Sequence, residues 1–458
     1  MTITPGALPA SLPTAASTSL MTDMYELTML QSALRAGTAE RDSVFELFGR
    51  KLPGSRRFGV VAGTGRLLDA IEAFTFAPEQ IDFLHRTGVV DDATLDFLRG
   101  YRFRGTIRGY AEGECYLAGS PLLTVEGTFA EACIIETLAL SIYNYDCAVA
   151  SAASRMTIAA HGRPCADFGA RRAHEEAAVA AARAAVIGGF QGTSDLEAAK
   201  RYGIRAIGTA AHAFTLLHDD ERAAFDSQVA NLGPGTTLLV DTYDVAQGVA
   251  NAVEAARAAG GELGAVRLDS GDLVAQAFKV RGQLDAMGAT STRITVTSDL
   301  DEYAIAALGA APVDSYGVGT RLVTGSGVPT AALVYKVVAR EDSGGGMVPV
   351  AKKSESKSTV GGMKVAGRVI GEEGYAAEEL LLVGVPLDEA ADALQARGAR
   401  PLQIPLVVDG RIDPRMWGSE ALARAQERHI RSRNELPYQA WRLSEGETAI
   451  PTRYEKAG

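Results

Sequence analysis

Residues 265–272 read AVRLDSGD, a short apolar run that leads directly into an acidic, glycine-containing turn. Residues 237–241, TLLVD, and residues 294–299, ITVTSD, repeat this design, and a helical pattern follows each of them. Short apolar runs that alternate with helical segments are typical of repeated β–α units, which build a parallel sheet. The sequence therefore predicts an α/β fold.

Seven runs of this kind between residues 146 and 340 favour an irregular (β/α) barrel of about seven parallel strands over an open sheet. The runs are expected to end at Asp167, residues 188–190, residues 208–209, Asp241, Asp269, residues 298–299 and Gly317. In both architectures ligands bind beyond the carboxyl ends of the strands. The polar residues at these positions are therefore candidate site residues.

The flanking segments have other patterns. Residues 1–20 are rich in Pro, Ser, Thr and Ala without periodicity, which predicts a disordered leader. Residues 21–145 mix helical and strand patterns and are expected to form an N-terminal α+β domain. Residues 341–458 are expected to form a small C-terminal region that packs back on the N-terminal domain, with no clear structure from Ser444 onward.

Length and charge restrict the class of protein. A chain of 458 residues is long enough for two or three domains, and a formal net charge of −11 disfavours non-specific binding to nucleic acid or anionic membranes. No signal peptide or membrane-spanning run is apparent, and the four cysteines lack metal-binding spacing. We expect a cytoplasmic protein with reduced thiols and neither nucleic acid nor membrane as a partner.

The first cluster of reactive residues is DFGARR, residues 167–172. Arg171 and Arg172 follow a predicted strand and can hold a carboxylate or a phosphate, while Phe168 can stack on a flat ring. The alternative is a capped helix start with surface arginines. A second cluster, GGFQGTSD at residues 188–195, offers backbone close to a ligand or simply a turn with a helix N-cap.

The third cluster is GTAAH, residues 208–212, which places His212 at a predicted strand end. A histidine there can be a general base, a ligand contact, a phosphoryl acceptor or a structural residue. In the fourth cluster Asp269 and Asp272 flank a glycine, with Asp241 and Asp299 at neighbouring strand ends. An acidic ring of this kind suits a ribose diol or hydrated Mg²⁺.

The fifth cluster, GVGTR at residues 317–321, is a glycine-rich turn that can present backbone N–H groups to a phosphate. The chain contains no P-loop or dinucleotide-binding glycine pattern, so nucleotide hydrolysis by a P-loop is not supported.

These five clusters, in this order, resemble the nicotinate phosphoribosyltransferase family. Residues 20–29, LMTDMYELTM, resemble its N-terminal signature, and the resemblance extends through residues 45–50, Glu112–Gly113 and residues 334–336 to about residue 440. It implies synthesis of nicotinate mononucleotide and pyrophosphate from nicotinate and phosphoribosyl pyrophosphate (PRPP), with coupled ATP hydrolysis, in NAD salvage. It also implies a type II phosphoribosyltransferase barrel and a homodimer with shared active sites.

The resemblance assigns roles by position. Phe168 and Arg267 would flank the pyridine ring, Tyr25 of the partner subunit would close it, and Arg171 would meet the carboxylate or a phosphate. His212 would be the phosphorylated histidine. The other substrate-binding positions and the catalytic carboxylates are Ser194, Thr209, Asp269, Asp272, Gly317, Gly319 and Thr320. Of these, Asp269 and Asp272 would hold the ribose. Mg²⁺ would lie nearby, bound through PRPP and water and without direct protein ligands. Gly317, Gly319 and Thr320 would hold the 5′-phosphate.

Three alternatives remain at this stage. Nicotinamide-using relatives carry an aspartate at the position of Ser194, and a hydroxyl suits the carboxylate of nicotinate better. Asp195, directly after it, leaves that argument incomplete. A quinolinate-using relative would not need the histidine motif, and a catalytically inactive metabolite-binding scaffold would not need Asp269, Asp272 and His212 together.

Overall fold

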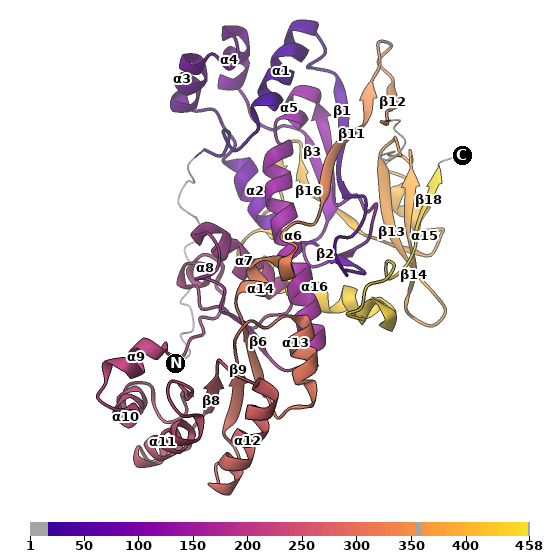
Figure 1. The fold of residues 1–458 in the computed structure, drawn as a ribbon. Helices are drawn as coiled ribbons and strands as arrows, with labels where there is room; N and C mark the ends of the chain where they lie inside the picture. The colour runs from indigo at the N-terminus through magenta and orange to yellow at the C-terminus, as the bar shows by residue number, and fades with distance from the viewer. Residues whose placement is uncertain (1–16, 353–359, 457–458) are drawn as a thin grey trace. The chain divides into compact units, whose positions relative to one another are not determined.

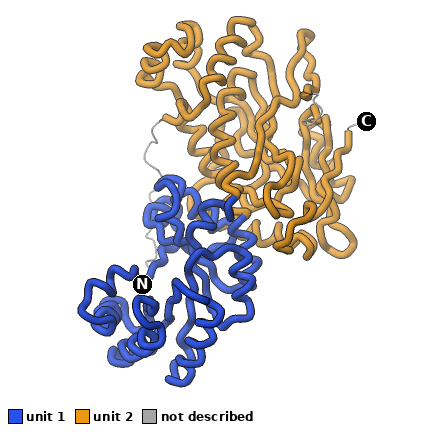
Figure 2. The backbone as a smooth tube through the Cα atoms, viewed as in Figure 1, with its two compact units in different colours: residues 1–8, 152–327 blue, residues 9–151, 328–458 orange. Residues whose placement is uncertain are grey.

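The computed structural model describes residues 17–352 and 360–456 (Figure 1). Within this range the chain forms two compact units, which Figure 2 shows in different colours. Unit 1 is residues 152–327, and unit 2 combines residues before 152 with residues from 328 onward. Helix α6 (Glu136–Ala159) contains the boundary between them.

Unit 1 contains a five-stranded parallel sheet in the order β6–β10–β9–β8–β7. Its strands are β6 (Cys165–Asp167), β7 (Thr237–Leu239), β8 (Ala265–Leu268), β9 (Arg293–Val296) and β10 (Ser315–Val318). Two single parallel bridges, Asp167 with Thr193 and Thr193 with Ala206, extend the sheet beyond β6. The predicted parallel α/β architecture is confirmed. Between Ala206 and β7 no ladder joins the described residues, so closure into a barrel stays a prediction.

The helices of unit 1 follow its strands. They are α7 (Glu175–Ile187), α8 (Leu196–Tyr202), α9 (His212–Leu217), α10 (Glu221–Leu232), α11 (Val245–Ala258), α12 (Leu273–Ala286), α13 (Glu302–Ala307) and α14 (Thr320–Val323). Several begin at an aspartate whose carboxylate accepts a backbone N–H three residues later: Asp195, Asp244 and Asp272 cap α8, α11 and α12. These caps satisfy N–H groups that have no partner inside the helix.

Two predicted strands are absent from this unit. The run expected to end at residues 208–209 contributes only the single bridge at Ala206. Residues 188–190 lie at the end of helix α7 and not at the end of a strand. The preceding run is rich in alanine, the strongest helix former, so helix propensity exceeds strand propensity there. Gly189 has a φ of 106°, which turns the chain back, and the extended contact with β6 is reduced to Thr193.

Unit 2 is built on a seven-stranded sheet in the order β12–β11–β1–β5–β3–β16–β17. Its strands are β1 (Asp42–Gly49), β3 (Thr106–Tyr110), β5 (Leu123–Thr128), β11 (Leu333–Glu341), β12 (Met347–Pro349), β16 (Gln403–Val408) and β17 (Arg411–Ile412). A short ladder joins β2 (Gly59–Val60) to β4 (Cys115–Tyr116). The helices are α1 (Met24–Ala36), α2 (Thr64–Glu72), α3 (Pro78–Thr87), α4 (Asp92–Arg99), α5 (Phe129–Cys133), the first part of α6, α15 (Ala390–Gln395) and α16 (Gly418–Glu435).

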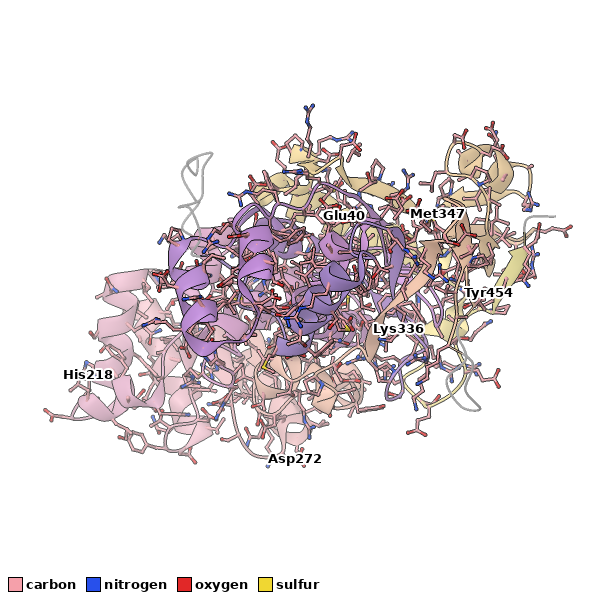
Figure 3. The ribbon with its side chains drawn as sticks, turned by 90° about the horizontal axis from the view of Figure 1, so that it is seen from above. Glu40, His218, Asp272, Lys336, Met347 and Tyr454 are labelled. Carbon is pink, nitrogen blue, oxygen red and sulfur yellow. The ribbon has the colours of Figure 1, made fainter. Side chains whose placement is uncertain are left out.

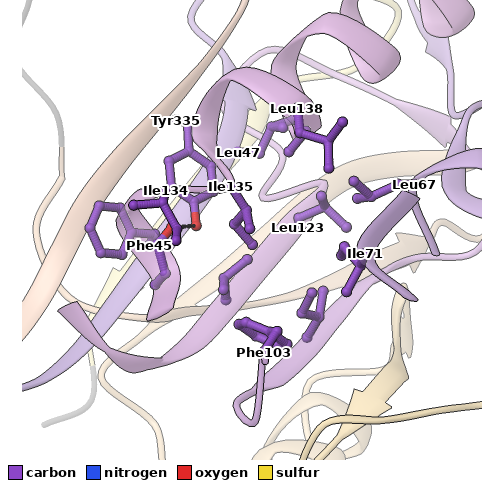
Figure 4. Packing of buried hydrophobic residues seen from close by; sticks show 14 of the residues in the cluster. Phe45, Leu47, Leu67, Ile71, Phe103, Leu123, Ile134, Ile135, Leu138 and Tyr335 are labelled. Carbon is purple, nitrogen blue, oxygen red and sulfur yellow. Dashed lines mark hydrogen bonds between the residues drawn. The ribbon is translucent and has the colours of Figure 1, made fainter. Parts of the chain in front are cut away.

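The main core of unit 2 lies between this sheet and its helices. Leu47 and Leu123 of the sheet pack with Leu67 of α2 and Leu138 of α6, all at most 2 % exposed (Figure 4). Burial of a large aliphatic side chain stabilises a fold by roughly 1.5–3 kcal/mol. The shared core explains why segments far apart in sequence form one unit.

A second, four-stranded sheet in unit 2 has the order β15–β13–β14–β18. It contains β13 (Lys364–Ile370), β14 (Ala376–Val383), β15 (Ala399–Pro401) and β18 (Thr452–Lys456). Strand β18 pairs in parallel with β14, so the expectation of no structure after Ser444 is wrong. The neighbouring β14 supplies the hydrogen bonds that this tail lacks by itself.

Residues 1–16 of the predicted leader lie outside the described residues. The leader does not extend to residue 20, however, because Thr18 and Ser19 are buried and Thr18 Oγ1 donates to the carbonyl of Ala70.

Candidate active site

The carboxyl end of β6 carries the first cluster. Asp167 is 1 % exposed, and its carboxylate accepts hydrogen bonds from the Gly169 N–H and the Thr193 hydroxyl, both at 2.7 Å. Burial raises the pKa of Asp167 to about 6, although the bonds from Thr193 and Gly169 act in the opposite direction. This aspartate therefore organises the turn that presents Phe168, Arg171 and Arg172.

Arg267, on β8, is the centre of the second group of contacts. Its guanidinium carbon lies 5.6 Å from the centre of the Phe168 ring, a cation–π arrangement. Its Nη1 donates to Thr209 Oγ1 at 2.9 Å, and its Nε donates to Thr297 Oγ1 at 2.9 Å. Its Nη2 lies 3.0 Å from Asp269 Oδ1. Its Nη1 also donates to the Ala210 carbonyl at 3.1 Å. These four contacts fix the guanidinium, so its planar face is available as a rigid wall for a flat ring.

His212 begins α9, and its side chain is 40 % exposed. Its Nδ1 is 3.0 Å from Thr242 Oγ1, and its Nε2 is 3.9 Å from Asp241 Oδ1. The Asp241 side chain is 2 % exposed, and its Oδ2 accepts from the Asp269 N–H at 2.9 Å and from the Ser270 hydroxyl at 2.7 Å. Asp241 thus connects the histidine to the turn that begins at Asp269.

The two carboxylates of that turn differ. Asp269 is partly buried, pairs with Arg267 and accepts a bond from the Thr297 hydroxyl. Asp272 is exposed (Figure 3), and it caps α12 by accepting from the Ala275 N–H at 3.1 Å. Gly271, between them, has a φ of 80°, which a residue with a side chain rarely adopts.

The glycine turn after β10 has two parts. Gly317 is buried within the ladder to β6, and the Phe168 ring lies against its Cα, so packing alone requires glycine there. Gly319 and Thr320 are partly exposed, and the side chain of Arg172 lies beside Gly319. The turn therefore combines accessible backbone with a neighbouring cation.

Ser194 is exposed at the end of the Thr193 bridge, whereas the Asp195 carboxylate accepts from the Ala198 N–H at 2.9 Å as the cap of α8. The capping role occupies Asp195 and leaves Ser194 as the side chain offered to a ligand. Tyr25 belongs to α1 of unit 2 and is 45 % exposed. Burial and nearby carboxylates, Glu136 first, raise its pKa to about 12.

The structure thus brings Phe168, Thr209, Arg267 and Asp269 into direct contact. It also shows two residues that the sequence did not single out, Thr242 and Thr297, and a buried structural role for the Asp167 carboxylate. Sequence position could have identified these residues as candidate site residues, since each directly ends or follows a predicted strand.

Comparison with known proteins adds independent information. Residues 20–144 match the model of the nicotinate phosphoribosyltransferase N-terminal domain, and residues 164–339 match the nicotinate phosphoribosyltransferase family. The chain belongs to the nicotinate phosphoribosyltransferase family. The family resemblance predicted from the sequence motifs is confirmed.

Individual relatives agree with this family assignment. A Mycobacterium tuberculosis protein, nicotinate phosphoribosyltransferase pncB1, is 53 % identical over 95 % of this chain and 94 % of its own length. The nicotinate phosphoribosyltransferase of Bacillus subtilis is 38 % identical over 79 % of this chain and 75 % of its own. The crystal structure of the human nicotinic acid phosphoribosyltransferase shares the fold, with a TM-score of 0.78, 24 % identity, and coverage of 95 % of this chain and 97 % of that one.

Two further observations concern metals and membranes. In the part of the chain that the structure describes, no three His, Cys, Asp or Glu side chains converge as metal ligands. None of the helices within residues 17–352 and 360–456 combines the length and apolarity that a membrane crossing requires.

Proposed function

We propose that this protein transfers the phosphoribosyl group of PRPP to the ring nitrogen of nicotinate, in NAD salvage, and couples this step to ATP hydrolysis. The observation that carries the proposal is the Phe168–Arg267 pair at the carboxyl end of the parallel sheet, with Asp269 bound to the same guanidinium. A flat cationic face beside an aromatic ring suits a pyridine ring, and a carboxylate close by suits a ribose.

The proposed substrate carries a carboxylate, for which the site offers cations and a hydroxyl. Arg171 and Arg172 are exposed directly after Phe168, and either can hold an anion. Ser194 supplies a hydroxyl where an aspartate would repel nicotinate. Because Asp195 is occupied as a helix cap, it does not weaken this argument.

In the proposed reaction the nicotinate nitrogen forms a bond to ribose C1, and the bond from C1 to the pyrophosphate oxygen breaks. Positive charge develops at C1, and the Asp269 carboxylate stabilises it. Asp272 would hold a ribose hydroxyl, while Gly319 and Thr320 would receive the 5′-phosphate beside Arg172. Mg²⁺ fits this site as an ion carried by PRPP and water rather than by a protein cage, and it would neutralise charge on the pyrophosphate.

ATP coupling is assigned to His212. Its ring is partly exposed and is oriented through Nδ1 by Thr242, as a phosphoryl acceptor needs to be. Asp241 bonds to the backbone N–H of Asp269, so a change at the histidine has a short path to the ribose-binding turn. We further propose a homodimer in which Tyr25 of the partner subunit closes the site, as its exposure on α1 permits.

The deciding experiment is a product assay with radiolabelled nicotinate, nicotinamide or quinolinate, each with PRPP, with and without ATP. We expect nicotinate mononucleotide and stimulation by ATP. Preferential use of nicotinamide, use of quinolinate with release of CO₂, or no turnover at all would refute the proposal. The His212→Ala variant should lose ATP stimulation and keep some basal transfer, and unchanged stimulation would refute the role of His212.

A further inference from the structure

The buried carboxylate of Asp167 joins two segments that are far apart in sequence. One oxygen accepts from the Gly169 N–H, and the other accepts from the Thr193 hydroxyl, both at 2.7 Å. The side chains of Asp167 and Thr193 are almost completely buried, at 1 % and 0 % exposure. Hydrogen bonds to a buried charged group are stronger than those between neutral groups, and removing one partner is costly.

Backbone hydrogen bonds reinforce this connection. The Asp167 N–H donates to the Gly192 carbonyl at 2.9 Å, and the Ser194 N–H donates to the Asp167 carbonyl at 2.8 Å. Thr193 Oγ1 also accepts from the Asp195 N–H at 3.0 Å. The segment that ends at Ser194 is therefore held against the end of β6 although it forms only a single bridge there.

The two joined segments carry the side chains proposed to contact the pyridine substrate. Phe168 and Arg171 directly follow Asp167, and Ser194 directly follows Thr193. The proposed contacts to PRPP lie on other segments, at Asp269, Asp272 and the turn after β10. A change in the spacing of the two segments should therefore affect the two substrates differently.

We propose that Asp167 and Thr193 are positioning residues, which fix the distance between the Phe168 and Ser194 segments and thereby determine affinity for the pyridine substrate. This inference rests on the proposed function. It concerns how the ring-binding segments are held, and it assigns neither residue a direct contact with substrate.

The test uses Thr193→Val, which keeps the shape of the side chain and removes the hydroxyl. Loss of the bond leaves an Asp167 oxygen without a partner, and a buried acceptor without a partner is unfavourable. We expect the KM for nicotinate to rise roughly tenfold, since 1.4 kcal/mol corresponds to a factor of ten, while the KM for PRPP changes less than about twofold. Equal changes in both KM values, or no change, would overturn the inference.

Two matched variants separate positioning from a general effect on folding. Thr193→Ser restores the hydroxyl and should return the KM for nicotinate to near its wild-type value. Asp167→Asn can still accept from Gly169 and can donate to Thr193, so it should also bind nicotinate normally. Failure of the serine variant to rescue, or a tenfold effect of the asparagine variant, would contradict a hydrogen-bonded connection.

A second measurement does not depend on turnover. Amide hydrogen exchange in the ligand-free Thr193→Val protein should be roughly tenfold faster in residues 168–172 and 192–195 than in the wild type, with the other strands of unit 1 unchanged. Unchanged exchange in these segments would overturn the inference whichever substrate the protein uses. Wild-type protein that turns over no nicotinate would instead refute the proposed function.

Discussion

Replacement of Gly317 by alanine tests the packing that places Phe168. A Cβ built on Gly317 would lie 2.6 Å from two ring carbons of Phe168 and 2.6 Å from Thr297 Cγ2. Carbon atoms in proteins pack at about 3.5–4.0 Å, so something has to move. Gly317 pairs with Ala166 in the ladder between β10 and β6, and the Phe168 ring is therefore the part expected to shift.

The size of the effect follows from two contributions. Overpacking of this kind destabilises a fold by about 1–3 kcal/mol. A displaced ring also loses its cation–π contact with Arg267, which is worth about 0.5–2 kcal/mol. If nicotinate binds against this pair, its KM should rise by a factor between about two and thirty, since 1.4 kcal/mol corresponds to tenfold.

The assay compares steady-state KM values for nicotinate and the free energy of unfolding in urea. The control is Gly282→Ala, at an exposed position of α12 where a Cβ meets no atom within 4 Å. This control should gain up to about 1 kcal/mol in stability from helix propensity and keep its KM. A Gly317→Ala protein with wild-type stability and wild-type KM would refute the packing argument.

Two further predictions concern stability. Ser298 has a φ of 125°, a conformation that costs a residue with a side chain about 1–3 kcal/mol. Ser298→Gly should therefore raise the free energy of unfolding, measured in urea, by about 1 kcal/mol. A decrease in this free energy would contradict the strain. His429 is fully buried, and burial first and Arg433 second lower its pKa to about 3. Its unfolded form takes up a proton below about pH 6.5, so stability should fall by up to about 1.4 kcal/mol per pH unit between pH 6.5 and 3. His429→Leu should remove this part of the acid sensitivity in urea unfolding at pH 7.5 and 5, and an unchanged difference between the two pH values would refute the assignment.

Much of the fold was predictable because its signals are local. The runs before Asp241 and Asp269 form strands, and Asp195 forms the N-cap that the sequence offered for its turn. The secondary-structure predictions were wrong where a partner distant in sequence, or a competing helix propensity, determines the conformation. Residues 188–190 end an alanine-rich helix, and residues 452–456 form a strand because β14 lies beside them.

The candidate site was predictable as a set of positions but not as a set of contacts. Phe168 and Asp269 were identified from residue type at strand ends, and Arg267 was identified from the family resemblance. Asp167 was treated as the end of a strand, yet its carboxylate is buried and joined to Thr193. Thr297 appeared to be an ordinary strand residue, yet it orients both Arg267 and Asp269.

The sequence by itself determined the repeated β–α units, the chemistry available at their carboxyl ends and the family. These properties depend on residue type and on short spacing, which linear order contains. Only the tertiary structure decided which side chains meet: Arg267 with Thr209 and Phe168, and Asp241 between His212 and Asp269. The reason is physical, because hydrogen bonds and ring contacts act over a few ångströms, and neighbouring strands bring together residues that the sequence separates by many positions.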